Sequence, residues 1–463
     1  MKMFYGIAIF ICLVVQSQEN YHRQSKSKEA QMGPQLSPLG ILGASGLFQV
    51  GRADIRIQHV EGNSIAELGG LKSGDVIVSA NGENFPKATN NVDDGGKGPR
   101  ESLGNAIEKS LGSQNKVLKL DVSRNGSQVA LTLKLPNLIT FSSNYPYKCQ
   151  RSSKMLKDIC EYLITQQKPD GSWRKYVLTS TAGLALLGSG DKKYKSAVKK
   201  AAYSIIDKDL AKGELPIWNF IYSGTFLCEY YLASGDSKVL KTINYINDTL
   251  ALKATSENGR HAHEITDEPG YKGGGLNIVT AHVYLFWTLA KKCGIKIHQK
   301  QYDAVLKHLT ISTRADGGTG YMRQATNVRD GSARTGLFAL GLYLSGDNNE
   351  LMNIQGKYLG KHYKRMREAH ANGLFGMIWG SAALACINQK GFREHMDYWK
   401  WYMNMGETPQ GHKLVRYYIG SKRNNGGDGY LNWDNFNHAT IGMFLVTGTK
   451  NLFIHGGQKR NWF

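Results

Sequence analysis

The sequence is poor in cysteine, and its cysteines have no recognisable pattern. Six occur in 463 residues, one of them at position 12, and the others show no close paired spacing and no CxxC motif. This scarcity disfavours both a disulfide framework and a cysteine-bound zinc site. We expect the cysteines within apolar helical runs to be small buried hydrophobic residues, and Cys149 is the one to test for pairing.

Apolar runs long enough to span a membrane are also missing. The run at residues 4–15 is shorter than the roughly 20 residues that a spanning helix needs. Lys2 precedes it and Val15-Gln16-Ser17 follows as a small-residue cleavage pattern, so residues 1–17 are predicted to be a secretory signal peptide. The protein is therefore expected to be secreted or periplasmic, without a transmembrane span after signal removal. A retained N-terminal anchor is the alternative.

Acidic residues are few compared with basic ones. The chain has 58 Lys and Arg against 37 Asp and Glu, a net charge of +21, and most of the excess lies in residues 147–463. An exported basic domain has an acidic polysaccharide, an anionic membrane surface or a cell-wall polymer as natural partner, with nucleic acid less suited. Many lysines lie on amphipathic runs, such as Lys192, Lys195 and Lys199, so a solvated outer face is the default explanation.

Residues 147–463 repeat one unit: an apolar helix rich in small residues, a tight turn and an amphipathic helix. The turns recur roughly every 45 to 60 residues and include Ser189-Gly190-Asp191 and Ser345-Gly346-Asp347. Helices that are apolar all round are buried, and those with one apolar stripe cover them. An unpaired amphipathic helix at 155–167 would close the array against the last apolar helix. The pattern predicts an all-α α6/α6 toroid of six helix pairs, with an open α-solenoid as the alternative.

Residues 18–33 are polar and aperiodic, which is typical of a linker, and the hydrophobic period changes to two in residues 34–140. The run HVEGNSIAELGGLKSGDVIVSANGENF in that segment resembles a PDZ domain. The resemblance implies a small β-rich α+β domain, so the chain is predicted to be multidomain, with this domain preceding the toroid. The arrangement also resembles a family of secreted bacterial proteins for which no reaction is established.

A PDZ domain binds a peptide or protein C-terminus as an added strand, with the carboxylate held by a glycine-containing loop. The resemblance places this loop at 42–46, the strand at 53–60 and the groove helix at 101–111. The implied peptide-binding residues are Leu42, Gly43, Ala44, Ser45, Ile55, Ile57 and Ile107. The Gly-rich stretch 84–100 is longer than a lean PDZ domain needs. A packing module that binds no free peptide is therefore the alternative.

Long loops lead into the apolar helices of the toroid and are expected to lie at one end, together with the positive helix N-termini. Arginines and tryptophans in these loops favour an anionic ligand with flat apolar faces, such as a uronic-acid sugar. The expected ligand-binding residues of this toroid mouth are His261, His263, Arg323, Arg334, His370, Asn372, Trp433 and His438.

Possible catalytic groups lie in the same loops. Candidates are Glu264, Asp330, Asp434 and His370, because a glycoside hydrolase needs two carboxyls and a lyase needs a His or Tyr base beside an Arg or Asn. The alternative to a catalytic role for Asp434 is that it caps the last apolar helix or its neighbours. The pair His261 and His263 is a weak metal-site candidate, with ordinary hydrogen bonding as the alternative. No cofactor is expected.

The stretches QQKPDGSW at 166–173 and NGGDGY at 425–430 resemble those of the squalene-cyclase, prenyltransferase and complement thioester toroids, but the catalytic motifs of those families are missing. The primary prediction is therefore an exported binding or scaffold protein whose toroid mouth holds an anionic ligand such as a glycan. The alternative is a polysaccharide lyase or glycoside hydrolase acting at that mouth.

Overall fold

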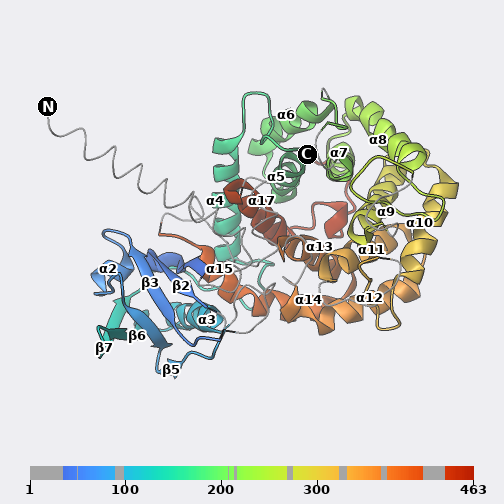
Figure 1. Ribbon diagram of the computed structural model, residues 1–463. Helices are drawn as coiled ribbons and strands as arrows, with labels where there is room; N and C mark the ends of the chain where they lie inside the picture. The colour runs from blue at the N-terminus through green and yellow to red at the C-terminus, as the bar shows by residue number, and fades with distance from the viewer. Residues whose placement is uncertain are drawn as a thin grey trace.

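The computed structural model describes residues 35–49, 51–88, 98–206, 208–212, 216–267, 275–322, 331–366, 373–409 and 433–463. A β-rich N-terminal domain lies beside a larger helical domain (Figure 1). In these ranges no helix combines the length and the apolar character that crossing a bilayer requires. The predicted signal peptide and the predicted linker lie outside the described residues.

The N-terminal domain is an antiparallel sheet in the order β1-β2-β3-β4-β6-β7, with β5 paired to β4 (Figure 1). Its strands are β1 (Gln35–Pro38), β2 (Ala44–Phe48), β3 (Ile55–Val60), β4 (Val76–Ala80), β5 (Glu83–Asn84), β6 (Val117–Arg124) and β7 (Ser127–Lys134). Two helices accompany them, α2 (Ile65–Leu68) and α3 (Pro99–Leu111). Leu103, Ile107 and Leu111 of α3 are buried, as expected of an amphipathic helix covering a sheet.

The helical domain is a closed ring. Its inner helices are α5 (Tyr176–Ser189), α7 (Pro216–Ser234), α9 (Asn277–Lys292), α11 (Ser332–Ser345), α13 (Gly373–Ile387) and α17 (Trp433–Val446). Each packs against the next, and α17 packs against α5. The outer helices are α4 (Gln150–Gln166), α6 (Lys195–Ile206), α8 (Leu240–Lys253), α10 (Gln299–Ile311), α12 (Asn349–Lys361) and α14 (Gln389–Tyr398). The first of them, α4, contacts both α5 and α17, so the ring closes as predicted and is not an open solenoid.

Glycines on the inner helices face aromatic rings of their neighbours. A Cβ added to Gly183 of α5 would lie 2.5 Å from the Phe226 ring of α7, and one added to Gly224 would lie 2.5 Å from the Phe286 ring of α9. Gly341 of α11 faces the Tyr284 ring in the same way. Distances this short leave no room for a side chain, which explains why the inner helices are rich in glycine.

The Ser-Gly-Asp turns end one helix and begin the next. Gly190 and Gly346 have φ angles of 75° and 77°, the left-handed conformation that glycine adopts without strain. The Asp191 carboxylate then accepts a hydrogen bond from the Lys193 backbone N–H at 3.1 Å, as an N-cap residue does. The sequence motif therefore encodes a helix stop and a helix start.

The segment after α17 covers the turn end of the ring. The Glu229 carboxylate of α7 is 1% exposed and accepts hydrogen bonds from the backbone N–H groups of Phe453 at 3.0 Å and Ile454 at 2.8 Å. The Phe463 N–H donates to the Ala233 carbonyl oxygen at 3.0 Å. Burial raises the pKa of Glu229 to about 7, although the two N–H groups favour its ionised form.

The predicted peptide groove differs from the structure in its strand. The expected strand at 53–60 contains β3, which pairs with β2 on one side and β4 on the other, so it offers no free edge for a peptide. The outer edge of β2 is also taken, because β1 pairs with it. Leu42, Ile55, Ile57 and Ile107 are fully buried in the core, and Gly43, Ala44 and Ser45 lead from the loop into β2.

A helix of the toroid domain occupies the face of this groove. The helix α15 (Lys400–Gly406) packs against α3 and against the short helix η1 (Gly40–Leu42) (Figure 1). A Cβ on Gly104 of α3 would lie only 2.5 Å from the Trp401 carbonyl oxygen. The Arg100 guanidinium lies 5.1 Å from the Phe48 ring centre and 5.9 Å from that of Trp401. These contacts favour the alternative of an internal packing module.

A buried polar cluster joins the two domains. Arg151 of α4 donates hydrogen bonds to Glu108 of α3 at 3.3 Å, to Asn404 of α15 at 2.8 Å and to Glu407 at 2.5 Å. The Asn404 amide donates in turn to the Gly104 carbonyl oxygen at 3.1 Å. A buried charge is tolerated only when its partners are in place, so this cluster specifies one arrangement of α3, α4 and α15.

The change Gly104→Ala should destabilise the protein through the α3–α15 contact. We expect the unfolding free energy to fall by about 1–3 kcal/mol, as for an overpacked core. The matched change Gly112→Ala, at the C-cap of the same helix, meets only an ordinary contact, 3.5 Å from the Thr140 methyl group, and should be close to neutral. Urea unfolding measures both. Equal effects of the two changes would contradict tight docking of α15.

The stability of the protein should depend on pH through Glu229. Its pKa of about 7 in the folded state exceeds the unfolded value of about 4.5, so the folded state holds the proton more tightly. This contribution is present below pH 4.5 and is lost as the pH rises through 7, an effect of ~3 kcal/mol. Urea unfolding between pH 4.5 and 8.5 should show this loss for the natural protein. The Glu229→Gln variant should show a clearly smaller loss, and an unchanged pH profile would refute the assignment.

Candidate functional site

Aromatic side chains meet across the inside of the ring. Trp218 and Tyr222 of α7 face Phe375 and Trp379 of α13, which lies opposite α7 in the order of inner helices. The rings of Trp218 and Phe375 stack with centres 5.6 Å apart, and the Trp379 indole N–H donates to the Tyr222 hydroxyl at 3.4 Å. His282 of α9 lies edge-on to Trp379 at 4.8 Å. We call these five residues the aromatic cluster.

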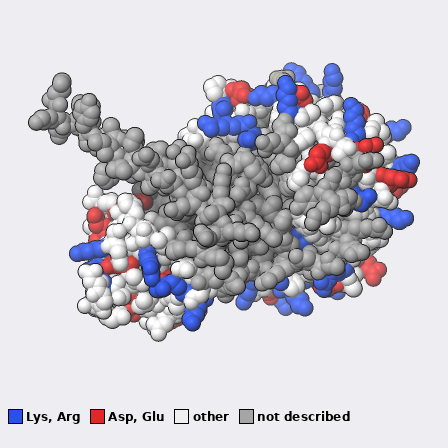
Figure 2. All heavy atoms as spheres, in the orientation of Figure 1, with Lys and Arg blue, Asp and Glu red and all other residues white. Residues whose placement is uncertain are grey.

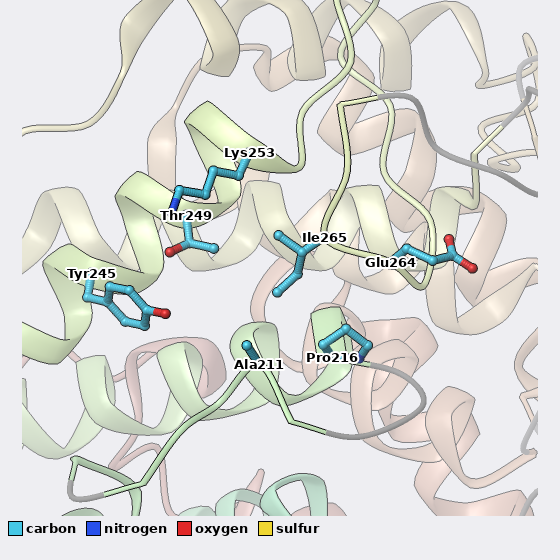
Figure 3. Close-up of a pocket in the computed structure, with 7 residues that line it drawn as sticks. All are labelled: Ala211, Pro216, Tyr245, Thr249, Lys253, Glu264 and Ile265. Carbon is cyan, nitrogen blue, oxygen red and sulfur yellow. The ribbon is translucent and has the colours of Figure 1, made fainter.

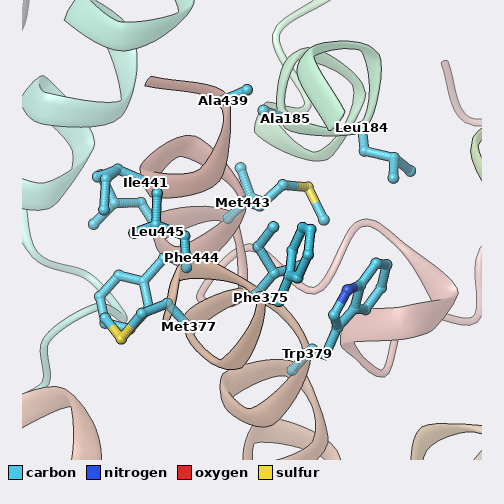
Figure 4. Close-up of a cluster of buried hydrophobic side chains, with 14 of the residues drawn as sticks. Leu184, Ala185, Phe375, Met377, Trp379, Ala439, Ile441, Met443, Phe444 and Leu445 are labelled. Carbon is cyan, nitrogen blue, oxygen red and sulfur yellow. The ribbon is translucent and has the colours of Figure 1, made fainter. Parts of the chain in front are cut away.

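The apolar side chains beside the aromatic cluster continue this filling. Figure 4 shows Phe375 and Trp379 projecting from α13 toward the space where Met443 of α17 and Leu184 of α5 also lie. All four side chains are buried. At this level the described side chains fill the ring axis. A ligand would therefore have to bind nearer the loop end, where α7 and α13 begin.

His263 lies next to the aromatic cluster at the loop end. The Trp218 indole N–H donates to its Nδ1 atom at 2.8 Å, and the two rings stack with centres 6.1 Å apart. Because Nδ1 accepts this bond, a neutral ring carries its proton on Nε2. Burial lowers the pKa of His263, and nearby Glu264 opposes that shift. His263 is therefore a neutral imidazole near pH 7, held against a tryptophan.

His261 has other neighbours than His263, and both rings form hydrogen bonds, which was the alternative to the weak metal-site candidate. The His261 side chain is fully buried, its Nε2 atom lies 2.9 Å from the Thr255 hydroxyl, and its ring lies edge-on to Trp287. Burial lowers the pKa of His261 to about 3. The two histidines thus bind separate neighbours. Across the described ranges, no three His, Cys, Asp or Glu residues are grouped as a metal site requires.

Arg334 and His438, two of the predicted ligand-binding residues, contact neighbouring segments of the toroid. The buried Arg334 donates from Nε to the Thr319 carbonyl oxygen at 2.8 Å and lies 5.6 Å from the Tyr321 ring centre. His438 is buried and stacks on Tyr162 of α4 with ring centres 3.8 Å apart. Arg334 therefore supports the segment around Thr319, and His438 supports the contact between α17 and α4.

Several predicted residues cannot be compared with the structure. Arg323, Asp330, His370 and Asn372 lie outside the described residues. Trp433 and Asp434 belong to the first turn of α17, but only their backbone is described. Their roles at the toroid mouth remain predictions.

A pocket of about 470 Å³ opens beside the loop end, on the outer side of α7 (Figure 3). One face of α8 lines the pocket with Tyr245, Thr249 and Lys253. The opposite side of the pocket is lined by Glu264, Ala211, Pro216 and Ile265. The α8 residues were not predicted, because they lie within an ordinary amphipathic helix. The sequence signal was Tyr245, an aromatic residue outside the buried stripe of Ile243, Ile246 and Leu250, and its side chain is 46% exposed.

A family model described as a domain of unknown function, DUF6288, matches residues 152–456. The chain belongs to this family. The DUF6288 match runs from α4 to η6 (Phe453–His455), so it covers the ring and leaves out the β-rich domain. No match supports the PDZ resemblance of that domain. None of the curated proteins compared with the chain matches it significantly.

Three solved structures are similar to the DUF6288 chain at low identity. The alpha-1,6-mannanase GH76A of Salegentibacter sp. HEL1_6 is 10% identical, with a TM-score of 0.46 over 65% of this chain and 99% of that chain. An inactive variant of this mannanase, in complex with alpha-1,6-mannotriose, is 11% identical and has a TM-score of 0.45 over 65% of this chain and 99% of that chain. An unsaturated glucuronyl hydrolase specific for heparin is 14% identical and has a TM-score of 0.45 over 64% of this chain and 96% of that chain. Similarity this low does not identify a substrate for the DUF6288 protein.

The change Trp218→Phe should raise the pKa of His263. It keeps an aromatic ring but removes the N–H donor that stabilises the neutral imidazole, so the pKa should move toward the usual value of about 6.5. An NMR titration of the histidine ring protons, assigned with His263→Gln, measures this shift. As a control, Trp173→Phe removes an indole N–H bonded to the Leu163 carbonyl oxygen and should leave His263 unchanged.

Proposed function

We propose that the loop end of the toroid binds a glycan and cleaves its glycosidic bonds, as a glycoside hydrolase or a polysaccharide lyase. The observation that carries the proposal is the contact of His263 with Trp218 of the aromatic cluster, with Glu264 next to His263 in sequence. A neutral imidazole held on an aromatic cluster, with a carboxylate beside it, combines the apolar wall and the few polar groups that a sugar site needs. The covered turn end leaves the loop end as the side for a ligand to enter.

The proposed roles follow from the chemistry of each group. The buried Trp218 holds the His263 ring in place, and the Nε2–H of neutral His263 is proposed to donate a hydrogen bond to the ligand. For a lyase, His370 is the proposed base that removes the proton beside a carboxylate group. For hydrolysis, Glu264 and Asp434 are the proposed carboxyl pair. Asp330 and His370 remain catalytic candidates. Arg323, Asn372 and Trp433 are proposed to contact the ligand, which an acidic sugar would suit best.

Binding without cleavage is the second candidate. It is favoured by the filled ring axis, because the aromatic cluster spans from α7 to α13 and leaves no deep cleft between the described side chains. In both cases we propose that the β-rich domain is a PDZ-like packing module, since α15 already covers α3 and η1. Export to the periplasm or beyond stays a prediction from residues 1–17.

Product analysis on a panel of neutral and uronic-acid polysaccharides tests the proposal. New reducing ends indicate cleavage, and an unsaturated product that absorbs ultraviolet light distinguishes a lyase from a hydrolase. For a hydrolase, Glu264→Gln or Asp434→Asn should lower kcat by roughly 100-fold or more. For a lyase, His370→Gln should do so, whereas His263→Gln should mainly raise KM. In either case Trp218→Ala should mainly raise KM.

The control variant is Glu257→Gln, which removes an exposed carboxylate from the same stretch of chain and should leave the rate unchanged. A glycan that binds without being cleaved would support the second candidate. Binding of no glycan in the panel, or cleavage that survives all the named changes, would overturn the assignment of the site to this end of the toroid.

A further inference from the structure

A group of exposed lysines covers the outer face of the ring at α6. It comprises Lys192, Lys193, Lys195, Lys199 and Lys200, all exposed, and we call it the lysine face. Figure 2 shows basic side chains along the upper edge of the molecule, above the position of α6 in Figure 1. It lies on the outer wall of the toroid, apart from the aromatic cluster inside.

Nearby carboxylates neutralise only part of this charge. Glu161 and Asp191 both form ion pairs with Lys193, and Lys199 extends over the Tyr203 ring at 5.3 Å. Among the described residues no carboxylate forms an ion pair with Lys192, Lys195 or Lys200. The lysine face therefore keeps an excess of positive charge.

The position of these lysines is unfavourable for the helix itself. Lys192 and Lys193 lie in the short helix η2 (Lys192–Tyr194), and Lys195 begins α6, whose first turn contains no acidic residue. The N-terminal end of a helix carries partial positive charge and favours acidic side chains. Helix stability therefore does not explain Lys192, Lys193 and Lys195.

A groove runs beside the lysine face. It has a volume of about 330 Å³ and lies between α4 and α6. Its lining comprises Lys193, Lys200, Glu161, Gln167, Ser196, Tyr194, Ile164 and Ala197. Glu161 pairs with Lys193, so Lys200 leaves the groove with an excess of positive charge. Its ammonium, amide and hydroxyl groups suit a polymer that carries both negative charge and hydroxyl groups. We infer that the lysine face and this groove bind an acidic polysaccharide.

Two other polyanions fit less well. Single-stranded nucleic acid needs open aromatic faces on which bases stack, but Tyr194 is buried and Tyr203 lies between Lys199 and Lys238. A membrane surface would favour exposed apolar side chains, and the large exposed ones in the described residues, such as Leu68 and Leu252, belong to neither α4 nor α6. The inference does not depend on the proposed function of the toroid mouth.

Titration of the full protein with heparin and with polygalacturonate, at several salt concentrations, tests the inference. The variant Lys192→Gln, Lys195→Gln, Lys199→Gln, Lys200→Gln should bind roughly tenfold or more weakly at low salt. The slope of log affinity against log salt should fall by about one for each lysine that contacts the polymer. Equal thermal unfolding midpoints would show that the variant is folded. If it is not, the double variant Lys199→Gln, Lys200→Gln replaces it.

The matched control removes four exposed lysines from other outer helices: Lys241→Gln, Lys300→Gln, Lys307→Gln and Lys357→Gln. It changes the net charge equally and should alter the affinity less than about twofold, since exposed charges beyond a Debye length act weakly. If the two variants lost the same amount of affinity, net charge alone would explain the loss, and the inference would be overturned. Tighter binding to single-stranded DNA or to anionic vesicles than to either polysaccharide would overturn the ligand class.

Discussion

The close approach of neighbouring inner helices is the constraint on which the rest of the structure depends. Where Gly183 meets Phe226 and Gly224 meets Phe286, an aromatic ring fills the space that a side chain would otherwise take. The distance between helices is thereby fixed around the ring, and with it the point at which α17 meets α5. Because the same contacts pack the interior, they also determine how far inward the aromatic cluster reaches and where a ligand is able to bind.

The sequence predicted the ring well because helix periodicity and turn chemistry are local. The turn Ser189-Gly190-Asp191 ends one helix and begins the next. The apolar stripe of α4 had no partner within a repeat unit, and the last inner helix lacked an outer helix, so closure of the ring between α4 and α17 could be predicted. The strands of residues 34–140 were predictable for the same reason, since alternation marks the buried face of a sheet. The occupant of the groove was not predictable, because α15 lies about 300 residues away from Gly104 in the sequence.

The candidate site was less predictable than the fold, because a loop side chain takes its direction from tertiary contacts. His261 and His263 are two residues apart, yet one bonds to Thr255 in the outer shell and the other to Trp218 at the ring interior. Arg334 was predicted to bind an anion because it belongs with the arginines of the long loops, and the structure places it against the Thr319 carbonyl oxygen and the Tyr321 ring. Only His263 among these residues combines partial exposure with a position beside the aromatic cluster.

The covered turn end has a consequence for how the chain folds during synthesis. The segment that bonds to Glu229 and Ala233 emerges from the ribosome after every helix that it touches, and so does α17, the partner of α4. Until they arrive, the apolar stripe of α4 at Leu156, Ile159 and Leu163 has no final neighbour on that side. Such transiently open apolar surfaces promote aggregation, so a nascent chain of this protein would benefit from chaperones until its late segments have emerged.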